Sequence, residues 1–260
     1  MKYSAVVGAA MALAFSAAAH AQQAGPRVAD AKPGEIRMFV TAAIRVPLDA
    51  VVAQASKAIG KTIVIQYGSA RGNLKDEIMK GQAFEVALLL PDVDEDLLKA
   101  GKIMPGSQEV ARVDVAIGLR GEAPGLDVST PAKLKDAMLK AKSVKYAPTG
   151  AALMTVRKVL SDLMIADTIK DSSKLREPVP LGPGEYELNF YPLSEILVNK
   201  NVVNLGPVTP ALQVPAIITA TVGKTTSDEK AARALIKFLQ GPTIDAALAG
   251  NGMKKGLVAG

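Results

Sequence analysis

The sequence predicts an α/β protein with two lobes, each a mostly parallel sheet flanked by helices. Short apolar, β-branched segments alternate with longer segments whose apolar residues have helical spacing, a pattern typical of βαβ units. Several strand segments are apolar throughout, as expected for strands covered on both faces. A second set of units begins near residue 113, and the end of the chain can return to the first set. Two crossing segments, near Arg112 and near Pro210, would then join the lobes.

The first lobe is expected to begin with three strand and helix pairs. The first helix has the clearest pattern, because its apolar residues fall on one face and Pro47 lies in its first turn. The expected strands are 36–40, 62–67 and 86–90, and the expected helices are 47–59, 73–79 and 94–100.

The second lobe and the return to the first follow the same reasoning. Ser129 or Thr130 is expected to cap the first helix of this part. The expected strands of lobe 2 are 113–119, 144–147, 188–191 and 202–205, and its expected helices are 131–141, 151–164 and 194–198. A return segment, 212–222, then leads back to lobe 1 and precedes helices 227–239 and 244–249. The predicted domains are therefore lobe 1 over 36–111 and 210–260, and lobe 2 over 112–209.

The N-terminus has the pattern of a secretory signal peptide. Lys2 is followed by an uncharged, alanine-rich run from Ala5 to Ala19, which is shorter than the roughly 20 residues that span a bilayer. The small residues around His20 predict cleavage after Ala21 and a periplasmic location. A loose leader, 22–35, separates the signal from the fold.

Composition excludes several kinds of chemistry. The chain has no cysteine, and its one histidine, His20, leaves with the signal peptide. Thiol nucleophiles, Ser-His-Asp relays, disulfides and Cys/His zinc sites are therefore excluded, and we expect no metal and no cofactor. The net charge of +6, less Lys2, favours a small anion as ligand. Nucleic-acid binding is disfavoured because tryptophan is absent and the lysines are dispersed.

Several segments together resemble the molybdate-binding branch of the periplasmic solute-binding proteins. They match that branch in order and spacing: 36–43, 75–87, 96–103, 147–151, 193–197 and 238–247. The resemblance implies a type II periplasmic binding protein fold, a monomer that closes its lobes on a ligand, and an ABC permease as partner. A few proteins similar to this branch are isomerases of unsaturated tricarboxylates, such as aconitate isomerase.

Four loops follow predicted strands and are expected to face the cleft. Open α/β sheets bind ligands at the carboxyl ends of their strands, where helix N-termini offer free N–H groups to an anion. The loops are Thr41–Val46, Gly68–Gly72, Pro148–Ala151 and Tyr191–Glu195.

The first two loops depart from the resemblance. Molybdate-type pockets use small hydroxyl residues there, and this chain keeps Ser69 but has Ala43 in place of a serine, with Arg45 and Arg71 nearby. An arginine fork fits a carboxylate better than it fits a caged tetrahedral oxyanion. We therefore expect an organic polycarboxylate as ligand, unless both arginines point away from the cleft.

The remaining candidates come from the other loops. Ligand contacts are predicted for Thr41, Thr149, Gly150 and Tyr191, although Thr149 has capping of the next helix as its alternative role. Three functions stay open at this stage: a polycarboxylate receptor, a tricarboxylate isomerase, and a molybdate or tungstate receptor.

An isomerase would need a group that carries a proton. The candidates are Tyr191, Tyr67 and Glu195, provided that their pKa values are shifted toward neutrality. Tyr67 and Tyr146 are alternatively packing residues at strand ends.

Overall fold

The computed structural model describes residue 28, residues 31–175 and residues 177–257. The predicted signal peptide and most of the leader lie outside these residues. Within them, no helix has both the length and the apolar character needed to cross a membrane.

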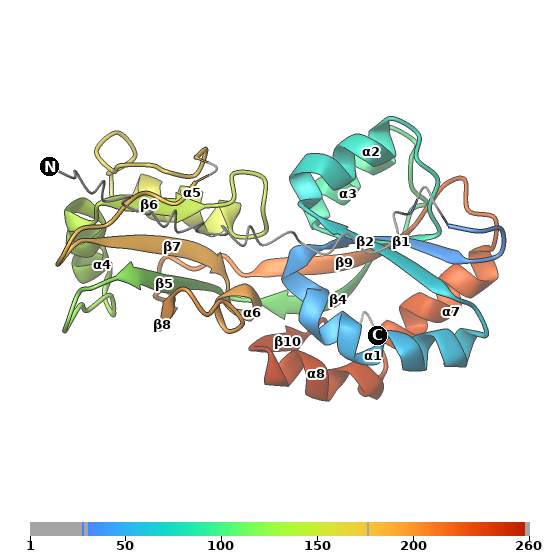
Figure 1. Cartoon of the computed structure of the whole chain (residues 1–260). Helices are drawn as coiled ribbons and strands as arrows, with labels where there is room; N and C mark the ends of the chain where they lie inside the picture. The colour runs from blue at the N-terminus through green and yellow to red at the C-terminus, as the bar shows by residue number, and fades with distance from the viewer. Residues whose placement is uncertain (1–27, 29–30, 176, 258–260) are drawn as a thin grey trace, which may run out of the picture.

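Lobe 1 is built on a six-stranded sheet in the order β10-β4-β9-β3-β1-β2. Its strands are β1 (Ile36–Thr41), β2 (Ile63–Gly68), β3 (Val86–Leu89), β4 (Gln108–Val113), β9 (Ala216–Val222) and β10 (Met253–Lys255). Its helical segments are η2 (Ala42–Ile44), α1 (Arg45–Ile59), η3 (Ala70–Leu74), α2 (Lys75–Met79), α3 (Pro91–Lys99), α7 (Glu229–Leu239), η4 (Pro242–Ile244) and α8 (Asp245–Gly250). Helices α2 and α3 cover one face of the sheet, and α1, α7 and α8 lie on the other (Figure 1).

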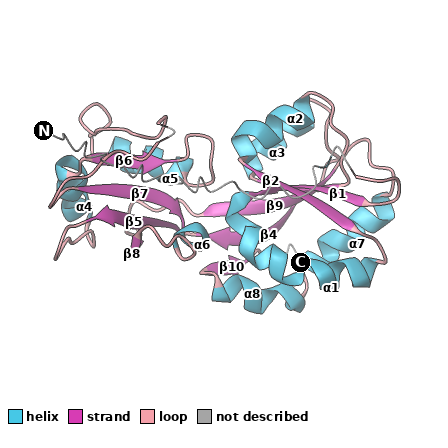
Figure 2. Ribbon diagram, viewed as in Figure 1, coloured by secondary structure: helices cyan, strands magenta, loops and turns pink. Residues whose placement is uncertain are grey.

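Lobe 2 is built on a four-stranded sheet in the order β6-β7-β5-β8. Its elements are β5 (Val115–Gly121), α4 (Pro131–Lys140), β6 (Ser143–Tyr146), α5 (Leu153–Asp162), β7 (Tyr186–Pro192), α6 (Leu193–Ile196) and β8 (Val203–Pro207). The two lobes lie side by side, each with its own sheet (Figure 2). Thr130 caps α4 by accepting a hydrogen bond from Lys133 N at 3.3 Å, as expected for one of the two candidate caps.

The two-lobed α/β class is confirmed, but the sheets are mixed rather than mostly parallel. Among the described strands, β1 pairs in parallel with β2 and β3, and β6 pairs in parallel with β7. Strand β9, returning from lobe 2, enters between β3 and β4 and pairs antiparallel with both. The pairings of β10 with β4 and of β5 with β7 and β8 are antiparallel as well. Strands β4 and β10 were not expected, since β4 is partly polar and β10 has three residues.

The chain passes between the sheets at two places. Asp114 alone separates β4 from β5, and residues 208–215 join β8 to β9. The expected strand 113–119 therefore spans the first crossing. A sequence pattern cannot mark this point, because apolar residues continue on both sides of Asp114.

Gln213 fixes the second crossing to lobe 2. Its Oε1 accepts a hydrogen bond from Val115 N at 3.1 Å, and its Nε2 donates to Val115 O at 2.9 Å. Thr155 Oγ1, on α5, lies 3.2 Å from the same Oε1. Most of this segment is therefore tied to lobe 2, and the chain leaves that lobe beside Pro215.

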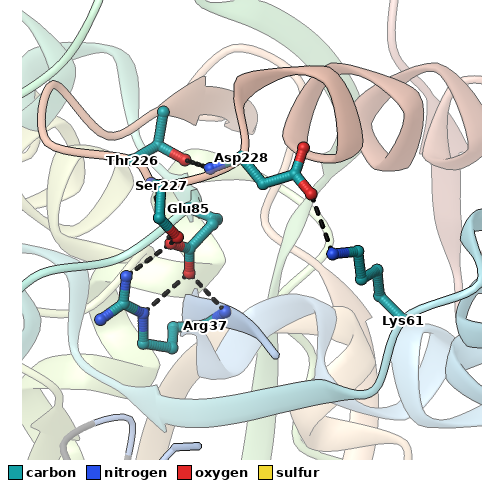
Figure 3. A network of polar contacts seen from close by, with 6 residues as sticks. All are labelled: Arg37, Lys61, Glu85, Thr226, Ser227 and Asp228. Carbon is teal, nitrogen blue, oxygen red and sulfur yellow. Dashed lines mark hydrogen bonds and ion pairs between the residues drawn. The ribbon is translucent and has the colours of Figure 1, made fainter. Parts of the chain in front are cut away.

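A buried ion pair holds the amino ends of β1 and β3 together in lobe 1. The Glu85 side chain is fully buried, and its oxygens accept bonds from Arg37 Nε at 2.8 Å and Arg37 N at 2.9 Å (Figure 3). Ser227 Oγ also donates to Glu85 at 3.1 Å, and Lys61 pairs with Asp228 at 3.0 Å beside it. Burial raises the pKa of Glu85, but the bonds from Arg37 outweigh it, so the net pKa is lowered.

Asp94 lacks such compensation. It is 5% exposed, on the side of α3 that faces β9, and both its carboxylate oxygens lack a hydrogen-bond partner among the described residues. Thr219 and Thr221 on β9 are also buried, with unpaired hydroxyls in the same part of the structure. Burial raises the pKa of Asp94 to about 6, despite the nearby hydroxyls of Thr219 and Ser107.

Asp94→Asn should stabilise the protein at neutral pH. Because folding raises the pKa of Asp94, the unfolded chain loses this proton first, and stability falls as pH rises from about 4 to about 6. A shift of this size corresponds to about 3 kcal/mol, so urea unfolding at pH 7.5 should favour the variant by up to that amount. At pH 3.5 the two proteins should have equal stability. Glu95→Gln, at an exposed site on the same helix, is the control; equal stability of wild type and Asp94→Asn at pH 7.5 would contradict the argument.

Candidate functional site

The candidate site lies where the carboxyl ends of β1 and β2 meet those of β6 and β7. The four loops that follow these strands face one another across the lobes. Ser194 Oγ of α6 donates to Ala43 O at 2.6 Å, and Ser69 Oγ lies 2.6 Å from Thr149 O. These hydrogen bonds join residues of different lobes, so the cleft is closed in this structure.

Two of the four loops begin substantial helices, and two do not. Helices α1 and α5 start at this edge without any side-chain cap, but their first N–H groups already have partners, since Arg45 N donates to Ala42 O and Leu153 N donates to Gly150 O. By contrast, α4 and α7, which begin elsewhere, are capped by Thr130 and Asp228. The expectation of four helix N-termini was wrong for the other loops, because Arg71 lies in a π turn and α6 is a single turn.

Ser69, Thr149 and Gly150 form the contact between the lobes. Ser69 Oγ is 2.7 Å from Thr149 Oγ1 as well as 2.6 Å from Thr149 O, so the two hydroxyls and the carbonyl form one network. Thr149 does not cap α5, whose N-cap residue is Ala152. The capping alternative for Thr149 is therefore wrong, and its predicted ligand contact stays a prediction.

Arg71 is directed toward lobe 2 but is already paired. Its Nε and one terminal nitrogen bind both oxygens of Asp92, at 2.6 and 2.9 Å, and the other terminal nitrogen donates to Gly150 O at 2.7 Å. The side chain is 14% exposed, so it is not a surface residue. Three of its five N–H donors are used, which leaves two for a ligand. Its predicted role as a carboxylate clamp stays a prediction.

Arg45 is the arginine with the freer guanidinium. It begins α1, two residues after Ala43, and stacks over the Tyr67 ring at 4.6 Å from the ring centroid. Its Nε lies 3.9 Å from Asp49, which is too long for a hydrogen bond. Tyr67 donates instead to Asp49, at 2.6 Å. Stacking holds the guanidinium in place while leaving its N–H groups available.

Thr41 and Ala43 are buried beneath the loops of the candidate site. Thr41 ends β1 and is 2% exposed, and Ala43 is 1% exposed with its methyl group in the lobe 1 core. Because the Ala43 carbonyl is bonded to Ser194, Ala43 has only its N–H to offer a ligand.

The three proton-carrier candidates have different pKa values. Burial and the hydrogen bond to Asp49 raise the pKa of Tyr67, and burial, with the charges of Glu195 and Glu187, raises the pKa of Tyr191 to about 12. Burial raises the pKa of Glu195 to about 7. Glu195 alone among the three meets the condition of a pKa near neutrality.

Tyr146 has a local role in lobe 2, where its hydroxyl donates to Asp171 at 3.1 Å. Sequence reasoning did not identify Asp92, Ser194 or Asp49 as part of this site. The available signal for Asp92 was its position, since it follows β3 at the same edge of the sheet as the chosen loops.

This chain belongs to the family of bacterial extracellular solute-binding proteins, which it matches over residues 36–254. Among individual relatives, it is similar to an aconitate isomerase from Pseudomonas sp. The two are 21% identical over 207 residues, which cover 76% of this chain and 79% of the isomerase.

Solved structures of binding proteins share the fold. The periplasmic molybdate-binding protein of Azotobacter vinelandii superimposes with a TM-score of 0.61 at 19% identity, covering 87% of this chain and 100% of that one. The sulfate-binding protein SubI of Mycobacterium tuberculosis H37Rv gives a TM-score of 0.65 at 14% identity, covering 85% and 86%. The two-lobed binding-protein architecture is therefore the fold of this chain.

The Glu195 carboxyl should titrate near neutral pH. Carbon-detected NMR of labelled protein should show one glutamate carboxyl resonance with a midpoint near 7, because burial disfavours the ionised form. Glu195→Gln should remove that resonance and thereby assign it. A Glu195 midpoint near 4.5 would show that water reaches the carboxylate.

Proposed function

We propose that this protein is a periplasmic receptor that binds a small organic polycarboxylate between its lobes and delivers it to an ABC permease. Membership of the solute-binding family supports the receptor role. The signal peptide pattern, with cleavage after Ala21, supports the periplasmic location. The proposed ligand contacts are the eight predicted residues: Thr41, Ala43, Arg45, Ser69, Arg71, Thr149, Gly150 and Tyr191.

The position of Arg45 carries the choice of a carboxylate ligand. Its guanidinium is stacked on Tyr67 beside a segment that contacts lobe 2, and its fork is not saturated by Asp49. A planar fork binds a carboxylate through two parallel hydrogen bonds. A second carboxylate can bind the two unused donors of the Arg71 guanidinium. Several separate donors in one cleft suit a ligand with several carboxylates.

The protonation state of Glu195 is expected to affect how strongly the anion binds. A fully charged anion would be repelled by an ionised carboxylate in a partly dry cleft, whereas a protonated Glu195 can donate a hydrogen bond to it. Because its pKa is about 7, Glu195 can take up a proton at little cost when the anion binds. Binding of the polycarboxylate is therefore expected to be stronger below pH 7 than above it.

A thermal-shift series on the purified protein tests this proposal. Citrate or trans-aconitate should raise the melting temperature with increasing concentration, and molybdate should not, since binding to the folded state alone is stabilising. Arg45→Gln should weaken tricarboxylate binding by about 2–5 kcal/mol in calorimetry, because a desolvated carboxylate loses its partner. The control is Arg233→Gln, on α7, where Arg233 pairs with Glu229 on the same helix. Stabilisation by molybdate alone would rule out the carboxylate ligand.

A second candidate function is the isomerisation of an unsaturated tricarboxylate. The observation that favours it is Glu195, whose pKa is about 7 and whose charge raises the pKa of Tyr191, and the similarity to an aconitate isomerase supports it. The Glu195 carboxylate would take a proton from the allylic methylene group of the substrate. The double bond would move, and the same proton would return to the other end of the allyl system. The reaction needs no oxidant and no cofactor.

Proton NMR in deuterated buffer tests this second function. Trans-aconitate incubated with micromolar protein should yield cis-aconitate. Glu195→Gln should abolish conversion while the thermal shift by trans-aconitate persists, since this variant keeps the shape of the cleft but loses the base. Tyr191→Phe should retain partial activity, because a pKa of about 12 makes Tyr191 a poor base. No conversion above a buffer blank would exclude this reaction and leave the receptor function standing.

A further inference from the structure

The loop Thr149–Ala151 of lobe 2 inserts into lobe 1. Ala151 is 6% exposed and packs within the hydrophobic core of lobe 1, away from the core of its own lobe. The carbonyl of Thr149 accepts hydrogen bonds from Ser69 Oγ at 2.6 Å and from Arg71 N at 3.2 Å. The carbonyl of Gly150 accepts one from the Arg71 side chain at 2.7 Å. Two successive carbonyl groups of one lobe are thus held by the other.

Asp92 holds the Arg71 guanidinium in position for this contact. The two side chains form a pair with two hydrogen bonds, at 2.6 and 2.9 Å, within lobe 1. This pair fixes the plane of the guanidinium, so the third nitrogen points at Gly150 O without further ordering. A lysine could not reproduce this arrangement, because a single ammonium group has no rigid fork.

The fit around Thr149 is close. A Cβ atom added at Gly72 would lie 2.9 Å from Thr149 Oγ1 and 3.3 Å from the Cβ of Ser69. Any larger residue at position 72 would therefore force the Thr149 hydroxyl to move and would disturb its hydrogen bond with Ser69. The loop is held by hydrogen bonds, by apolar packing and by a matching surface, and all three exist only when the lobes are closed.

We propose that Arg71, oriented by Asp92, is a latch that closes the lobes through the carbonyl groups of Thr149 and Gly150, even without bound solute. Arg71 is in this respect a positioning residue, since the contact sets the spacing of the two cleft walls. The latch does not depend on the identity of the solute, and it stands or falls separately from the proposed function.

A closely matched control lies one helical turn away. Lys75, the first residue of α2, pairs with Asp96 of α3 at 2.6 Å, and each of the two residues lies four positions after its counterpart in the Arg71–Asp92 pair. The exposed fractions of Asp96 and Asp92 are 50% and 52%. Lys75 has no hydrogen bond to lobe 2 among the described residues. Loss of the Lys75 pair therefore reports the general effect of breaking an ion pair between these segments.

Distance measurements between labels on the two lobes test the latch. Because the chain has no cysteine, Lys57→Cys on α1 and Ala132→Cys on α4 provide two unique exposed labelling sites. Single-molecule energy transfer, without solute, should show mainly the closed distance in the parent protein. Arg71→Gln and Arg71→Lys should lower the closed-to-open ratio at least about tenfold, as expected for loss of a charge-assisted hydrogen bond. Lys75→Gln should leave the ratio unchanged.

Three results would overturn the proposal. They are a parent protein that is open without solute, an Arg71→Gln variant with an unchanged ratio, and a Lys75→Gln variant that opens to the same extent as Arg71→Gln. If Arg71→Gln does not fold, Asp92→Asn and Gly72→Ala test the same proposal, since the first weakens the hold on the guanidinium and the second crowds the Thr149 hydroxyl. If citrate fails to bind any variant, the proposed ligand is wrong but the ratios still report on the latch.

Discussion

The insertion of the Thr149–Ala151 loop into lobe 1 is the contact on which the geometry of the cleft depends. The two sheets are joined by only two crossing segments, and one of these is tied to lobe 2 by Gln213. Two narrow connections leave the lobes free to bend about Asp114. Contacts across the cleft must therefore determine how far the lobes close, and the loop that carries Ala151 into the opposite core is one of these contacts, together with the hydrogen bond from Ser194 to Ala43 O.

The buried carboxylates divide into two groups that reflect different roles. Glu85 in lobe 1 and Glu187 in lobe 2 are both buried beside an arginine, and hydrogen bonds outweigh burial to lower their pKa values. Each anchors strands within one lobe. Asp94, which is buried, and Glu195, which is half-buried, form no ion pair among the described residues, and removal from water raises their pKa values. An uncompensated carboxyl group costs stability at neutral pH, and Glu195 lies in the loop after β7 that is proposed to face the ligand.

The roles of Arg45 and Arg71 in ligand binding stay predictions, but the structure shows which residues each of them contacts. Arg45 and Arg71 were selected because both follow strands at the ligand-binding edge, and the structure places both near the contact between the lobes. Their surroundings differ because of residues distant in sequence. Arg71 meets Asp92, 21 positions away, and Gly150, 79 positions away. Arg45 meets the ring of Tyr67. These pairings depend on how strands are ordered in the sheet, which local sequence patterns do not encode.

The sequence by itself determined the α/β class, the family resemblance and the exclusion of cysteine and histidine chemistry, because periodicity and composition are local properties. It did not reveal the mixed sheets, since the direction of β9 is set by its return from the other lobe. Only the tertiary structure decided that Thr149 bonds across the cleft instead of capping α5, and that Glu195 and not a tyrosine has a pKa near neutrality. Both outcomes arise from burial and contacts between lobes, which exist only once the chain has folded.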